Sequence, residues 1–334
     1  MQSHSPRIRC RVPCAGRISV LFAGAIVGLS LSACEAPLDM SQVDAQSEKP
    51  VHRTDDFLSA VNAGDSVIMV GLDGVVVKLV DGAPVARTVL TYDKGIERPA
   101  LVAVDQCPDG SLVALDAHRF VWMAPGSDGP WTSKPVTSSE DLMSLDCSQG
   151  GDYWIAASFG TILKSSDHGD SWTEFSTGDD LILTTVKFTG ADTGYAFGEY
   201  GTVLKTVDRG ATWQALAPIP DEIYPLTAEL KNDSEWWVGG LNGLILTSKD
   251  AGQTWTREDS GTASPIYKFT LADGKLFALG EFGTIRVQSE GSTKWARDAA
   301  SQSIRSYLRA SAATDNGLIV GGGSGSYLRI AFDK

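Results

Sequence analysis

The side chains that most often do chemistry are few and scattered in this sequence. The four histidines, at positions 4, 52, 118 and 168, stand apart from one another, and no Ser/His/Asp nucleophile arrangement, Gly-rich phosphate loop or metal-ligand spacing is present. Acidic neighbours such as Asp179 with Asp180 and Asp221 with Glu222 offer the paired carboxylates that a glycoside hydrolase uses. The same pairs equally serve to solvate loops. We therefore expect no catalytic residue, no metal site and no cofactor.

One cysteine has a setting that predicts covalent modification. Four arginines lie before residue 18, no acidic residue precedes Glu35, and residues 18–31 form an apolar stretch that is short for a membrane span. The stretch ends in Leu31-Ser32-Ala33-Cys34, which resembles the bacterial lipobox. That resemblance implies that the thiol of Cys34 is lipidated and that cleavage leaves it as the first residue. An ordinary secretory signal, with Cys34 incidental, is the alternative.

This signal divides the chain. We interpret residues 1–33 as a lipoprotein signal peptide, residues 34–47 as the lipidated cysteine with a flexible tether, and residues 48–334 as the folded domain. We therefore predict a lipoprotein that is anchored in a membrane and faces the periplasm. Glu35 stands where an aspartate would favour inner-membrane retention in enterobacterial lipoproteins, so the resemblance favours the outer membrane over the inner membrane.

Internal repetition is the main structural signal. Residues 160–172 (GTILKSSDHGDSW) recur as residues 201–213 (GTVLKTVDRGATW) and as residues 243–255 (GLILTSKDAGQTW). The tryptophans at 131, 172, 213, 255 and 295 are spaced by 41, 41, 42 and 40 residues, and incomplete units begin at Gly74 and Gly325. Seven units result. Residues 186–189, 194–198, 202–206 and 213–216 are short, β-rich segments separated by turn chemistry.

Four strands per repeat of about 40 residues predict an all-β fold, a seven-bladed β-propeller of four-stranded blades. The chain ends shortly after the third strand of the last blade. We therefore expect residues 49–54 to supply the missing outer strand and close the ring, which would remove an exposed sheet edge.

The motif Ser-x-Asp-x-Gly-x-Thr-Trp, which is best preserved in the three units ending at Trp172, Trp213 and Trp255, resembles the Asp-box of bacterial neuraminidase (BNR) repeats. In such a hairpin turn the aspartate accepts backbone N–H bonds, the glycine takes a conformation closed to other residues, and the tryptophan packs between sheets. A calcium loop is the alternative, although each box offers fewer oxygen ligands than calcium needs. The predicted structural residues are Asp167, Gly169, Trp172, Asp208, Gly210, Trp213, Asp250, Gly252 and Trp255.

Units such as residues 194–213 resemble the photosystem II stability/assembly factor family, and the resemblance covers about residues 55–332. It implies a seven-bladed propeller that is not an enzyme and that assists the assembly of membrane proteins on the periplasm-equivalent side. Members from photosynthetic organisms use an arginine-rich patch for their partner. In this chain only Arg305, Arg309 and Arg329 lie near one another in sequence. The resemblance therefore implies an assembly or accessory role in a bacterial envelope.

A glycoside hydrolase of sialidase-like propeller type is the rival class, because sialidases also carry Asp-boxes. Sialidases typically show an Arg-Ile-Pro element in the first blade, and this tripeptide is absent. The only arginines of the first blade are Arg53 and Arg87. The non-enzymatic interpretation is therefore preferred.

Two further cysteines, Cys107 and Cys147, lie 40 residues apart, which is one repeat period. They could occupy equivalent positions on neighbouring blades and form a disulfide in an oxidising compartment. Two buried free thiols are the other interpretation, and the sequence does not choose between them.

Net charge narrows the class of partner. The formal charge is −13, and removal of residues 1–33 with their four arginines brings it to −17. Without a Lys/Arg stripe the chain cannot neutralise phosphates, so we expect no nucleic-acid partner. We expect instead an envelope membrane protein or complex with basic loops.

The loops joining second to third strands share a face with the loops between blades, and aromatic residues lie there among carboxylates. The candidate partner-binding residues are Glu199, Tyr200, Tyr224, Tyr267, Glu281, Phe282 and Tyr307. Tyr200 and Phe282 could alternatively plug the central channel.

Overall fold

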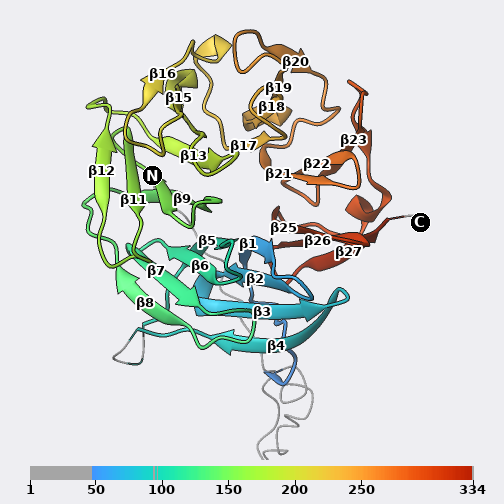
Figure 1. The fold of residues 1–334 in the computed structure, drawn as a ribbon. Helices are drawn as coiled ribbons and strands as arrows, with labels where there is room; N and C mark the ends of the chain where they lie inside the picture. Colours follow the sequence, from blue (N-terminus) through green and yellow to red (C-terminus); the bar gives the residue numbers. More distant parts are fainter. Residues whose placement is uncertain (1–46, 93–94, 96, 333–334) are drawn as a thin grey trace, which may run out of the picture. The chain divides into compact units, whose positions relative to one another are not determined.

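The computed structural model describes residues 47–92, 95 and 97–332. In this part of the chain 27 strands form seven antiparallel sheets, and each sheet follows the order of its strands in the sequence. The sheets are arranged as the blades of a propeller (Figure 1). The predicted seven-bladed β-propeller is therefore confirmed. None of the described helical turns is long and apolar enough to cross a membrane.

Each blade begins with its innermost strand, and the later strands follow outwards. Blades 1 to 3 contain β1 (Phe57–Asn62), β2 (Val67–Gly71), β3 (Val75–Val80), β4 (Ala83–Val89); β5 (Leu101–Gln106), β6 (Leu112–Asp116), β7 (Phe120–Ala124), β8 (Thr132–Pro135); and β9 (Leu142–Cys147), β10 (Tyr153–Ala157), β11 (Thr161–Ser165), β12 (Thr173–Ser176). Blades 4 and 5 contain β13 (Leu183–Phe188), β14 (Gly194–Gly198), β15 (Val203–Thr206), β16 (Gln214–Ala215); and β17 (Thr227–Leu230), β18 (Trp236–Gly239), β19 (Ile245–Ser248), β20 (Thr256–Glu258). Blades 6 and 7 contain β21 (Ile266–Ala272), β22 (Lys275–Gly280), β23 (Ile285–Ser289), β24 (Ala296–Arg297); and β25 (Leu308–Thr314), β26 (Gly317–Gly322), β27 (Tyr327–Ala331).

The burial of each strand follows from its place in the blade. Second strands such as β6 (LVALD) and β10 (YWIAA) are buried along their whole length because other blades cover both faces. Outer strands such as β4 are mostly exposed. Consecutive inner strands contact one another, including β25 with β1, so the described blades form a closed ring. One apolar cluster lies at each of the seven junctions between blades.

The predicted closing strand is wrong. Within the described residues blade 7 has three strands, β25-β26-β27, and residues 49–54 form turns and bends instead of a strand. The buried carboxylate of Asp55 holds these turns, because it accepts the amide of His52 at 2.7 Å and pairs with the Arg87 guanidinium at 2.7 and 2.9 Å. The Arg87 guanidinium also donates to the Pro50 carbonyl. This segment therefore fastens blade 1 to blade 7 through loop contacts.

Candidate partner-binding face

Seven tight loops, which we call the tip loops, join the second and third strands of the blades. Each has one non-glycine residue in the left-handed region, with φ between +52° and +66°. In six of them a glycine follows, and in blade 1 a Cβ on Gly74 would meet the Leu90 carbonyl oxygen at 2.3 Å. The left-handed residues of blades 1 to 7 are Asp73, Arg119, Phe159, Tyr200, Asn242, Phe282 and Ser324.

Three of these left-handed residues are aromatic, which is unfavourable for the backbone. Bulky side chains are rare at positive φ, whereas Asn and Asp tolerate it. Phe159, Tyr200 and Phe282 are nevertheless 55%, 61% and 71% exposed. Neither Tyr200 nor Phe282 lines the central channel cavity. These aromatic residues therefore present their rings to solvent at the end of the ring of blades, together with Leu241, which is 54% exposed.

The remaining candidate tyrosines are half-buried and make specific contacts. The Tyr267 hydroxyl donates to Glu281 at 2.8 Å, and the Arg309 guanidinium lies 5.8 Å from the centre of its ring. Burial, the hydrogen bond and the charge of Glu281 raise the pKa of Tyr267. Burial and the negative charge of Glu199 raise the pKa of Tyr224, and burial together with nearby Asp56 raises the pKa of Tyr307. These phenols therefore stay protonated at neutral pH.

The two candidate glutamates also have bonds within the fold. One Glu199 carboxylate oxygen accepts the backbone amide of Ile182 at 2.8 Å, which ties the tip loop of blade 4 to the loop entering that blade. Glu281 accepts the Tyr267 hydroxyl in the same way in blade 6. Both carboxylates therefore orient the exposed aromatic residue that follows them.

Negative charge is concentrated on one part of this face. The loops 136–142, 158–160, 177–182, 199–201 and 216–226 contain seven carboxylates and no Lys or Arg. Among the described residues, none of the seven forms an ion pair. We call this set the acidic arc: Glu140, Asp141, Asp179, Asp180, Glu199, Asp221 and Glu222. The exposed rings of Phe159 and Tyr200 lie on its loops.

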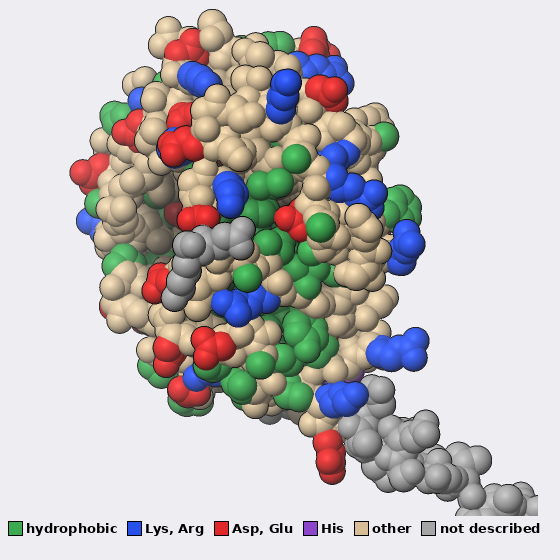
Figure 2. All heavy atoms as spheres, turned by 90° about the vertical axis from the view of Figure 1, so that its right-hand side faces the viewer, with side chains coloured by type: hydrophobic (Ala, Val, Ile, Leu, Met, Phe, Trp, Pro, Cys, Tyr) green, Lys and Arg blue, Asp and Glu red, His purple; other side chains and the backbone are tan. Residues whose placement is uncertain are grey.

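Basic side chains form no comparable patch on the side of the molecule in Figure 2. Lys and Arg are interspersed there with acidic and apolar side chains. Arg305 precedes β25, Arg309 lies in β25 and lines the channel cavity, and Arg329 lies in β27.

The central channel contains a charged cluster that the sequence analysis did not identify. It surrounds a cavity of about 210 Å³ lined by the inner strands. Asp105 accepts the Cys147 amide at 2.8 Å, Asp146 accepts the Phe188 amide at 3.1 Å, and Lys187 pairs with Glu229 at 2.9 Å. Each contact joins one blade to the next.

Burial and the adjacent charge of Asp105 raise the pKa of Asp146 to about 8, while Lys187 opposes this shift. Burial likewise raises the pKa of Asp105. Lys268 lines the same cavity, and burial and the charge of Lys187 lower its pKa. Because both aspartates accept amides of the following blade, we interpret the cluster as a joint between inner strands.

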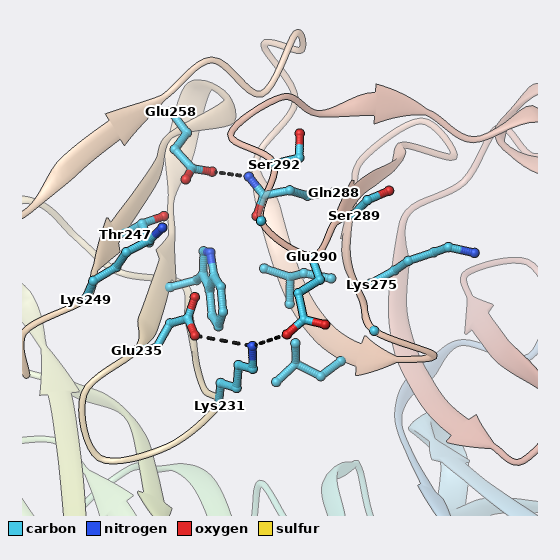
Figure 3. A pocket seen from close by; sticks show the side chains of 15 residues that line it. Lys231, Glu235, Thr247, Lys249, Glu258, Lys275, Gln288, Ser289, Glu290 and Ser292 are labelled. Carbon is cyan, nitrogen blue, oxygen red and sulfur yellow. Dashed lines mark hydrogen bonds and ion pairs between the residues drawn. The ribbon is translucent and has the colours of Figure 1, made fainter.

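A groove between blades 5 and 6 is lined by charged residues that pair across it (Figure 3). Lys231 binds Glu290 at 2.8 Å and Glu235 at 3.4 Å, and Gln288 donates to Glu258 at 2.7 Å. The cavity measures about 70 Å³. Since one water occupies about 30 Å³ in the liquid, the groove has room for roughly two water molecules. Because its charged lining is paired between the two blades, we interpret the groove as a joint between them.

The turns between third and fourth strands lie at the other end of the blades. In blade 4, one carboxylate oxygen of Asp208 accepts hydrogen bonds from the Thr206 hydroxyl and the Thr212 amide. The other oxygen accepts one from the Thr212 hydroxyl. The Gly210 amide donates to the Thr206 hydroxyl. The turns at Asp167 with Gly169 and at Asp250 with Gly252 repeat these bonds.

These donors stabilise the ionised carboxylates. The Thr212 hydroxyl and amide, with the Thr206 hydroxyl, lower the pKa of Asp208 to about 2, and the equivalent serines lower the pKa of Asp167 to about 2. Trp213 is 8% exposed and packs edge-on against Trp154 and Phe188. Trp172 and Trp255 pack against the apolar clusters of their own junctions.

Cys107 and Cys147 form a disulfide in the structure, with Cα atoms 5.2 Å apart. Cys107 follows β5 and Cys147 ends β9, so the bridge joins the inner strands of blades 2 and 3. Cys34, the other cysteine singled out in the sequence, lies outside the described residues.

Comparison with known proteins identifies the family that the chain is similar to. The family model described as photosynthesis system II assembly factor YCF48 matches residues 110–207. The photosystem II assembly lipoprotein Ycf48 of Synechococcus sp. (strain CC9605) is 34% identical over 184 residues, which is 53% of this chain and 43% of that protein. The resemblance to the photosystem II assembly factors is thereby confirmed. The chain spans about half, or less, of the length of the curated relatives it matches.

Solved structures share the fold at low sequence identity. A structure described as YCF48 bound to D1 peptide has a TM-score of 0.68 at 13% identity and covers 85% of this chain and 94% of that chain. A catalytically inactive virginiamycin B lyase from Staphylococcus aureus, with quinupristin, has a TM-score of 0.72 at 10% identity, over 84% and 96% of the two chains. At these identities both comparisons establish the propeller architecture alone.

Proposed function

We propose that this protein is a non-enzymatic assembly or stability factor for a membrane protein complex of the bacterial envelope. Its similarity to proteins named as photosystem II assembly lipoproteins supports this class of function. The observation that carries the proposal is the face formed by the tip loops. Every tip loop needs a residue with positive φ, and in three blades this residue is an exposed aromatic, although the equivalent Asp73 and Asn242 show that the turn accepts better-suited residues.

The proposed partner segment is basic and contains apolar side chains. None of the carboxylates of the acidic arc forms an ion pair among the described residues, although the Arg119 guanidinium reaches its edge at the Ser139 carbonyl, so a cationic segment would complement the arc. Its charge would chiefly speed association, and salt would screen this gain beyond roughly 8–10 Å. Affinity would come from burial of the exposed rings of Phe159, Tyr200 and Phe282. Since the basic residues are scattered in the sequence, with only Arg305, Arg309 and Arg329 near one another, we propose an envelope complex other than a photosystem.

The aspartate turns and the disulfide have structural roles in this proposal. The turns at Asp167, Asp208 and Asp250 correspond to Asp-boxes that fasten third to fourth strands. The bridge between Cys107 and Cys147 fits an oxidising compartment such as the periplasm.

We further propose that Cys34 carries the lipid anchor. Several relatives are named as lipoproteins, which supports an anchored form. Buried acyl chains contribute about 0.8 kcal/mol per CH₂, so a multiply acylated terminus stays in the membrane. The glutamate at position 35 favours the outer membrane as its location.

Chemical crosslinking of the full-length protein in intact cells, followed by mass spectrometry, tests the function. We expect crosslinks from the tip-loop face to basic loops of an inner- or outer-membrane protein. The control is the same cell line treated after deletion of the gene for the identified partner, in which these crosslinks disappear. Recovery of no protein partner, together with hydrolysis of fluorogenic glycosides by the purified protein, would contradict the proposal.

A further inference from the structure

At six of the seven junctions between blades, an aromatic ring from the outer part of the following blade packs into the apolar cluster. Five of these rings are tryptophans that directly precede a fourth strand, namely Trp131, Trp172, Trp213, Trp255 and Trp295. The sixth is Phe332, which follows β27 and packs between blades 6 and 7. Among the described residues, the cluster between blades 7 and 1 contains no such outer ring.

The turn between the third and fourth strands of blade 1 explains this difference. Val80 pairs with Ala83, so Asp81 and Gly82 form a two-residue turn. The corresponding turn of blade 3 comprises residues 165–172 and ends in a tryptophan. A Cβ on Gly82 would meet the Cδ atom of Arg329 at 2.7 Å, so the short turn lies directly against blade 7. It carries no side chain that could replace the indole.

A cavity of about 370 Å³ lies between blades 7 and 1, which are neighbours in the ring (Figure 1). Its lining includes the turns 64–66, 80–82 and 314–316, so it opens at the end of the blades opposite the tip loops. The groove between blades 5 and 6, where Trp295 packs, measures about 70 Å³. Ligand cavities in proteins measure roughly 300–1,000 Å³, so the larger cavity has room for a small molecule. We call it the junction cavity.

The inner part of the junction cavity is apolar and contains one unpaired hydroxyl. Val67, Leu79 and Ile319 line it and are at most 2% exposed. Ser66 lines it beside them and is 4% exposed, and its hydroxyl has no hydrogen-bond partner among the described residues. A buried hydroxyl without a partner is costly. An indole ring suits this lining, because it is a flat apolar body with a single N–H donor.

The rim of the junction cavity carries more negative than positive charge. Asp65, Asp81 and Asp315 are exposed there, and none of them forms an ion pair among the described residues. Arg329 is the one basic residue of the lining, and its guanidinium donates to the Asn316 carbonyl at 3.1 Å. Three carboxylates against one guanidinium complement a cationic group on the ligand.

We propose that the junction cavity binds a small molecule that combines an indole ring with a cationic group. The ring occupies the space that a box tryptophan fills at the other junctions, and its N–H donates to the Ser66 hydroxyl. The cationic group lies among the carboxylates of Asp81, Asp315 and Asp65. Because the cavity lies at the opposite end of the blades from the tip loops, this site does not rest on the proposed function.

Isothermal titration calorimetry of the purified full-length protein with tryptamine tests the ligand class. We expect tryptamine to bind, and indolepropionate, which replaces the cation by a carboxylate, to bind at least about tenfold more weakly. Butylamine, which has the cation without the ring, should show no binding. Absence of tryptamine binding, or equal affinity for tryptamine and indolepropionate, overturns the proposal.

Matched charge variants locate the site. Asp81→Asn combined with Asp315→Asn should weaken tryptamine binding about tenfold, and asparagine tolerates the φ of +53° at position 81. Asp192→Asn combined with Asp273→Asn makes the same charge change in the first turns of blades 4 and 6 and should leave the affinity unchanged. Equal weakening in both pairs assigns the effect to overall charge and overturns the proposal.

Ser66→Ala tests the orientation of the ring. This variant removes a hydroxyl that has no partner in the fold, so urea unfolding should show no loss of stability. Tryptamine should bind about fivefold more weakly to the variant, whereas a tryptamine methylated on the ring nitrogen should bind equally to both proteins. Unchanged tryptamine affinity in Ser66→Ala overturns the assigned contact.

Discussion

Replacing Phe282 by asparagine should leave the stability of the propeller almost unchanged while weakening partner binding. The side chain is 71% exposed, and its backbone has a φ of +54°. Blade 5 already has an asparagine, Asn242, at the equivalent left-handed position with the same φ of +54°. The backbone of Phe282→Asn therefore needs no rearrangement.

The expected change in the free energy of unfolding is the difference between the burial lost with the ring and the backbone strain that asparagine relieves. With about 200 Å² for a phenylalanine ring and about 25 cal/mol per Å², the buried three-tenths of Phe282 contributes at most about 1.5 kcal/mol, part of which asparagine retains. Relief of the left-handed conformation returns on the order of 1 kcal/mol, because asparagine tolerates it better. The free energy of unfolding should thus change by less than about 1 kcal/mol.

Urea unfolding measures this change, and Phe277→Ala in the buried strand β22 is the control. Phe277 is 1% exposed, so its truncation should cost about 3–5 kcal/mol. Capture of the partner from membranes should fall for Phe282→Asn and persist in proportion to folded protein for the control. If Phe282→Asn instead lowered the free energy of unfolding by about 3 kcal/mol or more, its ring would belong to the core and the reasoning would be refuted.

Three further predictions concern the anchor, the disulfide and the channel. Cys34→Ala should remain unlipidated and move to the soluble periplasmic fraction, and soluble wild-type protein would contradict the anchor. Alkylation before intact-mass measurement should label neither Cys107 nor Cys147, and labelling of both thiols in the native protein would exclude the bridge. Because the bridge closes a long loop, Cys147→Ser should lower the free energy of unfolding by about 4 kcal/mol. Because the pKa of Asp146 is raised to about 8 in the folded state, this state binds more protons than the unfolded state between the ordinary pKa of an aspartate and about pH 8. The free energy of unfolding should therefore fall as pH rises through this window. Urea midpoints should show a smaller fall in Asp146→Asn, and an equal fall would assign the pH dependence to other groups.

The repeat allowed the fold to be predicted from the sequence alone. The recurrence of residues 160–172 at a spacing of 41–42 residues predicted the strands of each blade to within a few residues, as β14 (Gly194–Gly198) shows. This worked because hairpin turns depend on local residues such as glycine and aspartate, whose conformational preferences act over a few positions.

The candidate face was predictable in location but not in detail. Topology alone places the tip loops beside the loops between blades, so Tyr200 and Tyr267 were both assigned there. Only the structure separates the exposed ring of Tyr200 from the half-buried ring of Tyr267, whose hydroxyl binds Glu281. The sequence also places Phe159 and Leu241 in the tip loops, one and two residues before the repeat glycines, although neither is among the candidate partner-binding residues predicted from it.

Contacts between residues that are distant in the sequence could not be predicted from it. The turn at Pro50 and Asp55 depends on Arg87 of another strand, so local sequence alone was equally compatible with a strand there. Asp105 and Asp146 lie within mostly apolar inner strands, and each accepts a backbone amide of the following blade. Aligning the repeats would have shown a polar residue at the fifth position of both β5 and β9.

Site-specific photo-crosslinking in living cells tests the central claim most directly. A photoreactive amino acid at Tyr200, which is 61% exposed on a tip loop, is compared with one at Val207, which is 62% exposed at the opposite end of the same blade. We expect a covalent adduct with a membrane protein at position 200 and none at position 207. Adducts of equal yield at both positions, or an adduct at position 207 alone, would contradict it.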